Sequence, residues 1–200
     1  MNFTPLTLAK ALSCPLARAE KWYEAVQYAT EVYEIDTTLN RLADFLAQIG
    51  HESGGLLYVV ELWGPTLAQK LYERSPNRPW VSRDPFNFKA FDLGNFDTGD
   101  GFRFRGRGPL QVTGRKNARL ASERLRLKFG DEVPDFEKDP RLMELPKWGM
   151  LTAGDFWDRT GLNALADSGD FRLQTKRING GYTHLAQRLT RRAAARLALV

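Results

Sequence analysis

The chain of 200 residues has a single cysteine, Cys14, and only two histidines, His51 and His184. One cysteine excludes an internal disulfide, and Cys14 lies far from either histidine, a poor context for a catalytic thiol. His51-Glu52 resembles the start of a helical zinc motif, but residue 55 is glycine where the second histidine would stand. We therefore expect no metal and no other cofactor.

Other common signals are also missing. No apolar run is long enough to cross a bilayer, so we expect no stable membrane insertion, and the N-terminus lacks the basic and apolar segments of a signal peptide. No Gly-Lys-Ser/Thr follows the glycines of residues 99–108, which excludes a Walker loop. If the target lies outside the cytoplasm, another component must deliver the protein.

The charge balance points to an acidic partner. The formal net charge is +5 and the pI is about 9.4, while 42% of residues are apolar and 26% are charged. These proportions are ordinary for a globular protein of one domain or two small lobes. A positive charge favours nucleic acid, a membrane surface or a bacterial cell wall.

Apolar residues recur at helical spacing through most of the chain. The expected helices cover two pieces of residues 4–35 and then residues 37–50, 115–129, 147–159, 162–178 and 185–197. The proline- and glycine-rich region 56–100 predicts short helices and turns, and the region 103–115 predicts a strand or extended loop.

Two sets of side chains have an ordinary structural interpretation. One is aromatic, either core residues of a small lobe or a platform for sugars, with core packing expected for most of them: Trp63, Tyr72, Trp80, Phe86, Phe88 and Phe91. The other is basic and is expected on the solvated outer face of the last helix: Arg188, Arg191, Arg192 and Arg196.

Two glutamates stand out near the end of the amphipathic helix 37–50. Glu52 falls beside Phe45 and Ile49, on the border of the apolar stripe. A carboxyl group that loses water there would hold its proton, as a general acid requires. Glu61 lies nine positions after Glu52, past two glycines and inside an apolar run. A charge in such surroundings is costly unless it has a partner or a function. A bend at the glycines would bring Glu61 to face Glu52.

Neither glutamate alone is strong evidence, because a glutamate at a helix end is usually a solvated charge. A competing interpretation uses Arg103, Arg105 and Arg107, with Phe104, as a strip that binds nucleic acid. The glycines around these arginines and the polar residues that follow fit a shaped groove better. The sequence therefore favours a reaction of two carboxylates on a polymer.

Three blocks carry a resemblance to a known family. They are His51-Glu52-Ser53-Gly54-Gly55, the run Gly-Arg-Gly-Pro-Leu-Gln-Val-Thr-Gly-Arg-Lys-Asn over residues 106–117, and Ile178-Asn179-Gly180-Gly181. In this order, within about residues 37–195, they resemble glycoside hydrolase family 19, the family of chitinases and bacteriophage endolysins. The resemblance implies a mainly α, lysozyme-like fold of two lobes around a central substrate cleft.

The resemblance also implies a domain plan. We expect residues 1–200 to form a single catalytic domain without a separate cell-wall-binding domain. The larger helical lobe would comprise about residues 1–57 and 101–200, and the smaller inserted lobe about residues 58–100.

Seven residues match functional positions of the family. Glu52 matches the general acid, Glu61 is the best match to the general base, and Thr113 matches a residue that helps hold the attacking water. The residues matched to substrate binding are Gln111, Asn117, Asn179 and Arg188. The last of these matches an arginine that pairs near the acid. Without the resemblance, Arg188 would be interpreted as solvated, and Asn179 would fit a helix cap as well as a functional role.

The chain departs from the plant members at two places. It has Tyr182-Thr183 where they carry a glutamate, and Lys116 where they carry an aromatic residue. Both departures count against chitin as the substrate, and the short Glu52–Glu61 spacing resembles the endolysin branch.

The resemblance implies inverting hydrolysis, in which the two carboxyl groups stand about 6.5–9.5 Å apart to admit a water molecule. We expect an endolysin that cleaves the β-1,4 bond between N-acetylmuramic acid and N-acetylglucosamine in peptidoglycan. It would act as a monomer without nucleic acid, accumulate in the host cytoplasm and act on the wall in the periplasm. The alternatives are a chitinase, a secreted antibacterial effector, or a non-enzymatic module that binds cell wall or nucleic acid.

Overall fold

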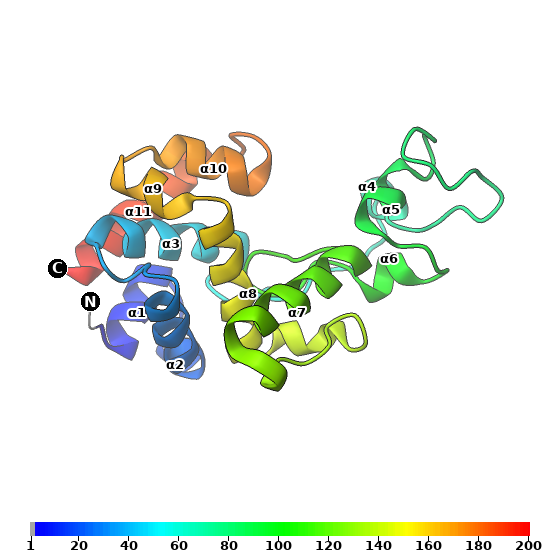
Figure 1. Ribbon diagram of the computed structural model, residues 1–200. Helices are drawn as coiled ribbons and strands as arrows, with labels where there is room; N and C mark the ends of the chain where they lie inside the picture. The colour runs from blue at the N-terminus through cyan, green and yellow to red at the C-terminus, as the bar shows by residue number, and fades with distance from the viewer. Residues whose placement is uncertain (1–2) are drawn as a thin grey trace.

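The computed structural model describes residues 3–200, and helices dominate it (Figure 1). The longer helices are α1 (Pro5–Leu12), α2 (Leu16–Val32), α3 (Leu39–Glu52), α7 (Arg115–Phe129), α8 (Pro146–Arg159), α10 (Phe171–Asn179) and α11 (Leu185–Leu199). The short ones are α4 (Leu67–Lys70), α5 (Phe88–Leu93), α6 (Asp100–Arg103), α9 (Leu162–Asp167) and the 3₁₀ turns η1 (Gly130–Glu132) and η2 (Pro140–Glu144). The mainly α prediction is confirmed.

Helix α3 forms the centre of the large lobe. In Figure 1 it lies between α1 and α9, with α11 alongside. Its apolar side chains from Leu42 to Ile49 are fully buried, and Phe45 packs edge-on against Trp157 of α8 with ring centroids 5.2 Å apart. Burial of such large aromatic side chains is the main source of stability for a domain of this size.

Local chemistry sets both ends of α3, which runs two residues later than expected. The hydroxyl of Thr38 accepts a hydrogen bond from the Arg41 amide at 3.2 Å, which caps the start. Beyond Glu52, Gly55 adopts a left-handed backbone with φ of 68°. A Cβ atom there would lie 3.0 Å from the Leu12 carbonyl oxygen, so only glycine fits this turn.

The small lobe, defined here as residues 62–103, contains α4, α5 and α6 and lies beside the start of α7, at the opposite end of Figure 1 from α1 and α11. It has little apolar core. The buried amide of Asn87 holds two loops together instead, because it donates to the carbonyl oxygens of Ser75 and Pro79, both at 3.1 Å. Polar contacts of this kind replace the hydrophobic packing found in the large lobe.

Core packing was therefore the wrong expectation for several aromatic residues. Phe86 is 54% exposed, and Phe88 and Phe91 are also exposed. Trp63 and Tyr72 are partly buried and contact each other with ring centroids 6.4 Å apart. A lobe of about 40 residues has too little volume to enclose so many rings.

An extended segment, residues 104–114, connects the small lobe to α7. Its pairing is limited to isolated antiparallel bridges of Arg107 with Val60 and with Val112, the only β-bridges within residues 3–200. Two main-chain bonds fix it to the chain beyond α3: Glu61 N donates to Gly106 O at 2.8 Å, and Gly108 N donates to Val59 O at 2.9 Å. The expected strand or extended loop is present only in part, because residues 108–111 form a tight turn that the Arg107–Val112 bridge closes, and α6 already covers Arg103.

Candidate active site

Glu52 is the last residue of α3, and its carboxylate pairs with Arg188 of α11. The Arg188 Nη2 atom lies 2.5 Å from Glu52 Oε1, and the two side chains are only 2% and 22% exposed. The expectation of a solvated Arg188 is wrong: this arginine is among the largest fully buried side chains of the described chain. The pairing brings together residues 136 positions apart, as the family resemblance implied.

A row of polar contacts, which we call the α3–α11 polar ladder, supports this pair. The ladder consists of Asn40, Asp44, Gln48 and Glu52 on α3 and Arg188, Arg192 and Arg196 on α11. Residues four apart lie on one face of a helix, so two facing rows can pair step by step. Arg192 Nε lies 2.5 Å from Asp44 Oδ1, and Arg188 donates to Gln48 Oε1 at 2.7 Å.

The ladder corrects the expectation of a solvated basic face on the last helix. Arg196 contacts Asn40, and Arg191 donates to the Leu12 carbonyl oxygen at 3.0 Å, so both arginines face inward. The helix spacing was read correctly, but sequence alone does not show that a partner helix supplies acceptors along the basic side.

Glu61 lies at the entrance to the small lobe and is held by donors. Gln69 Nε2 donates to Oε1 and Gly106 N donates to Oε2, each at 2.9 Å. One donor on each oxygen fixes the direction of the carboxylate, which a group that positions water needs.

The side chains of Gln111 and Thr113 lie near Gly106, the residue whose amide holds Glu61. A Cβ atom at Gly106 would lie 2.5 Å from Gln111 Oε1 and 3.2 Å from Thr113 Oγ1, so the missing side chain leaves room for these two groups. The Thr113 hydroxyl donates to Gln111 O at 2.9 Å, and its oxygen can still accept a hydrogen bond.

Asn117 belongs to the same group of residues. Its side-chain amide donates to Thr113 O at 2.7 Å. Gln111, Thr113 and Asn117 also share a cavity of about 180 Å³ with side chains of α7 and α8. Three of the predicted site residues, Glu61, Gln111 and Thr113, therefore lie around Gly106, and Asn117 joins them through Thr113.

A short turn connects the acid and base segments. Tyr58 N donates to Ser53 O at 2.8 Å, and Gln111 Nε2 donates to Tyr58 O at 3.3 Å. A Cβ atom at Gly54 would lie 3.0 Å from the Tyr58 ring, so the glycine allows the ring to fold back over the turn.

Asn179 lies apart from these groups. It is exposed at the end of α10, and within residues 3–200 it makes no hydrogen bond to another predicted site residue. The loop that follows does reach the acid side, since Arg188 Nε donates to Thr183 O at 3.4 Å. A substrate contact by Asn179 stays a prediction.

Three contributors were not found from the sequence. Gln48 accepts from Arg188, and Gln69 donates to Glu61. His51 packs against His184, with ring centroids 5.5 Å apart. Burial, reinforced by nearby Arg188, lowers the pKa of His51 to about 4, so its imidazole is neutral near pH 7. Of these residues, only Gln48 could have been found from the sequence, because it lies one helical turn before Glu52 on the same face of the helix.

The described residues contain no group of three or more His, Cys, Asp or Glu side chains suited to a metal ion, and none of their helices is long and apolar enough to span a membrane. The large helical lobe, the smaller polar lobe and the extended segment between them form the fold of the lysozyme-like glycoside hydrolases.

Comparison with known proteins identifies the family within that class. A "glycosyl hydrolase family 19 domain-containing protein" of Haemophilus influenzae is 32% identical over 167 residues, which cover 73% of this chain and 74% of that protein. The chain belongs to glycoside hydrolase family 19 and is a glycoside hydrolase. A scan against models of protein families gave no match.

Solved structures agree on the fold. Chitinase C of Streptomyces griseus superposes with a TM-score of 0.66 at 16% identity, covering 98% of this chain and 76% of that one. A bacterial family 19 chitinase described as differing from plant enzymes gives a TM-score of 0.69 at 19% identity, covering 98% and 94%.

Proposed function

We propose that this chain hydrolyses the β-1,4 bond between N-acetylmuramic acid and N-acetylglucosamine by an inverting mechanism, and that residues 1–200 act as one catalytic domain. The observation that carries the proposal is the contrast between two carboxylates on separate segments. Glu52 is partly buried and pairs with Arg188, whereas Glu61 accepts hydrogen bonds from Gln69 and from Gly106, and Thr113 lies near Gly106.

In this mechanism Glu52 protonates the glycosidic oxygen as the bond to the anomeric carbon breaks. Arg188 then stabilises the carboxylate that remains after proton transfer.

Glu61 would take a proton from a water molecule on the opposite face of the sugar. The water donates one hydrogen to Glu61 and the other to Thr113 Oγ1, which leaves its lone pair directed at the anomeric carbon. Holding the water in this way favours direct displacement and an inverted product.

The substrate follows from charge and from departures in sequence. A net charge of +5 suits an anionic wall polymer better than neutral chitin. Tyr182-Thr183 and Lys116 replace residues that the plant enzymes use. The solved relatives named above are chitinases, so chitin cleavage is the second candidate.

In the cell we propose a role in lysis of a bacterial host, with accumulation in the cytoplasm before release to the wall. Delivery as an antibacterial effector by a secretion system would use the same chemistry.

The test is digestion of purified peptidoglycan and of chitin oligomers, followed by mass spectrometry of the new ends. We expect reducing N-acetylmuramic acid ends from peptidoglycan, and no release by the Glu52→Gln variant. Cleavage of chitin alone, or anhydro-muramic ends, would overturn the proposal. Turbidity of permeabilised Gram-negative cells separates hydrolysis from binding, because a binding module clears nothing.

A further inference from the structure

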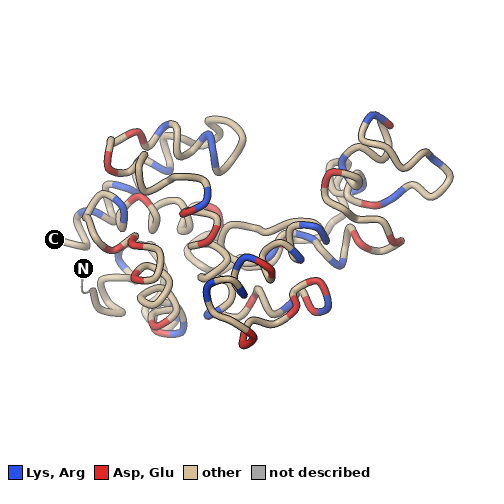
Figure 2. Tube along the Cα trace, in the orientation of Figure 1, with Lys and Arg blue, Asp and Glu red and all other residues tan. Residues whose placement is uncertain are grey.

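A cavity of about 540 Å³ at the lobe junction contains none of the predicted site residues. It lies between α6, the extended segment 104–114 and η2. Basic and acidic residues are interspersed over both lobes in Figure 2, but this cavity collects five basic side chains and only two acidic ones. The basic side chains are Arg103, Arg105, Arg107, Lys138 and Arg141, and the acidic ones are Asp139 and Glu144.

Two of the five basic groups already have ionic partners. Arg107 pairs with Glu144, and Arg141 Nε lies 2.8 Å from Asp139 Oδ1. The excess positive charge therefore belongs to the other three.

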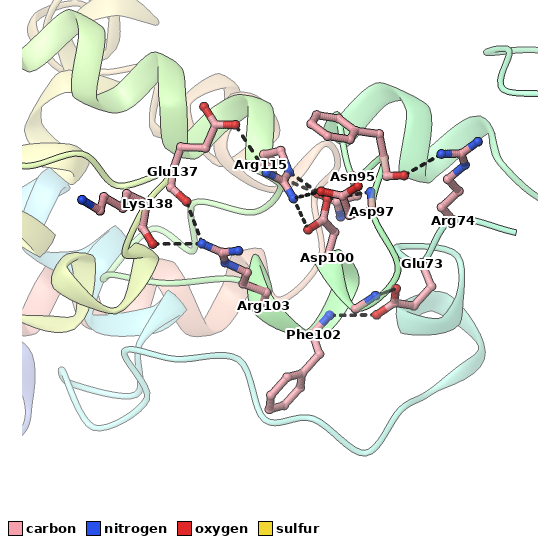
Figure 3. Close-up of polar contacts among 12 residues, drawn as sticks. Glu73, Arg74, Asn95, Asp97, Asp100, Phe102, Arg103, Arg115, Glu137 and Lys138 are labelled. Carbon is pink, nitrogen blue, oxygen red and sulfur yellow. Dashed lines mark hydrogen bonds and ion pairs between the residues drawn. The ribbon is translucent and has the colours of Figure 1, made fainter. Parts of the chain in front are cut away.

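Those three side chains make no ion pair within residues 3–200. Arg103 donates to the carbonyl oxygens of Glu137 and Lys138 at 3.2 and 2.9 Å, as Figure 3 shows. Arg105 donates to Phe102 O at 2.8 Å and stacks on the Phe102 ring, with 4.1 Å from Cζ to the ring centroid. Carbonyl oxygens and a ring orient a guanidinium group but do not neutralise it.

Arg107 strengthens the case, because it is 97% buried and its Nε has no hydrogen-bond partner among the described residues. Burial and the nearby Arg105 lower the pKa of Arg107 to about 10, even though Glu144 is in contact with it. The Arg107 guanidinium therefore stays charged at neutral pH, and the neighbouring basic side chains keep its surroundings positive. A buried donor without an acceptor is costly, and an anionic ligand in the cavity would supply one.

The cavity lies behind the segment that positions Glu61. Successive side chains of an extended segment point to opposite sides. The Cβ direction of Gly106 faces Gln111 and Thr113, whereas Arg105 and Arg107 both line the cavity. One segment therefore separates the proposed water site from a cationic chamber.

We propose that this lobe-junction cavity binds the free carboxylates of the peptide stem that peptidoglycan carries on every second sugar. The inference rests on the proposed function, since it names the part of that substrate that the cavity would hold. An extended stem of five residues spans about 17 Å, enough to pass from a cleft to the far side of one segment. Guanidinium groups bind carboxylates through paired, charge-assisted hydrogen bonds, and chitin offers no such group.

The experiment measures binding of a synthetic stem peptide with two free carboxylates to the full chain carrying Glu52→Gln, by calorimetry. The comparison peptide has both carboxylates amidated. Arg105→Gln with Lys138→Gln removes two unpaired charges and leaves both ion pairs in place. Lys10→Gln with Lys21→Gln makes the same charge change on exposed positions of α1 and α2.

We expect the free peptide to bind, the amidated peptide to bind about tenfold more weakly, and the cavity variant to show a similar loss. The control variant keeps the affinity of the parent. Equal binding of both peptides, equal losses in both variants, or no binding at all would overturn the cavity assignment.

A second arm separates this inference from the proposed function. With Glu52 intact, the cavity variant should lose activity on peptidoglycan that carries stems and keep it on glycan strands stripped of peptide. Failure to cleave either polymer would reject the proposed function but leave the peptide-binding result standing. Equal activity of the cavity variant and the parent on both polymers would reject the cavity alone.

Discussion

Glu52 and Glu61 are nine residues apart in the chain, yet they are held in different ways. Glu52 ends a buried helix, and Arg188 and the other members of the α3–α11 polar ladder hold it in place. Glu61 is held by one main-chain amide and one side-chain amide beside the small lobe, which has little apolar core. Support for the acid is therefore part of the core of the large lobe, whereas support for the base depends on the path of one loop.

This difference predicts two classes of variant. Changes around Glu52 should reduce stability and activity together, because they leave buried polar groups without partners. Changes around Glu61 should reduce activity with little effect on stability. The four predictions that follow test this division, from the largest expected effect to the smallest.

The largest effect is expected for Arg188→Leu. Breaking a buried ion pair by removing one partner costs about 3–5 kcal/mol, and partial exposure of Glu52 places this pair toward the lower end. Urea unfolding measures the loss, and activity on peptidoglycan should disappear with it. Arg188→Lys keeps the charge but loses the fork that also reaches Gln48, so it should regain part of the stability and little activity. Unchanged unfolding in the leucine variant would contradict the account.

On the base side, Gly106→Ala should affect activity far more than stability. The new methyl group would fall 2.5 Å from Gln111 Oε1 and 3.2 Å from Thr113 Oγ1, so both side chains must shift. We expect turnover to fall about 100-fold, since small displacements of a positioning group have effects of that size. The melting temperature should change little. Gly130→Ala gives a comparison at a glycine whose added Cβ has no neighbour within 4 Å, although its positive φ adds strain. Full turnover in the Gly106 variant would show that the placement of Gln111 and Thr113 near Gly106 does not matter for catalysis.

Thr113→Val tests whether the Thr113 hydroxyl orients the attacking water. The change removes the hydroxyl and keeps the shape, and we expect a loss of about tenfold in kcat with KM nearly unchanged. Thr113→Ser keeps the hydroxyl and should stay close to the parent enzyme. Equal losses in the two variants would show that packing, and not the hydroxyl, matters at this position.

The smallest effect concerns His51 and acid stability. Its pKa is about 4 in the folded chain, below the ordinary value of about 6.5. Between these values the unfolded chain binds a proton that the folded chain does not, so stability should fall as pH drops through this window. His51→Gln should flatten the dependence, whereas His184→Gln should retain most of it. Thermal unfolding at several pH values from 4 to 7 measures the slope, and equal slopes in the two variants would oppose the assignment.

Part of this architecture could be predicted from the sequence. Helix spacing located α3, α7 and α8 within about two residues, because an apolar stripe of period 3.6 survives in any environment. The convergence of Gln111, Thr113 and Asn117 followed from the resemblance of one block.

The features that could not be predicted from the sequence depend on contacts between distant segments. The same periodicity that located α11 could not show that its arginines face a row of acceptors on α3. Nor could composition show that Asn87 would hold the small lobe together while Phe86 stayed exposed. In both cases the partner lies in another loop or helix, and spacing along one segment carries no information about it.

The most direct test of Glu52 as the general acid is turnover of purified peptidoglycan by Glu52→Gln. The account predicts a loss of about 1000-fold with unchanged substrate binding, since the amide keeps the shape of the side chain but cannot donate the proton. Turnover at the level of the parent enzyme, in a variant that is still folded, would contradict the assignment of Glu52 as the acid.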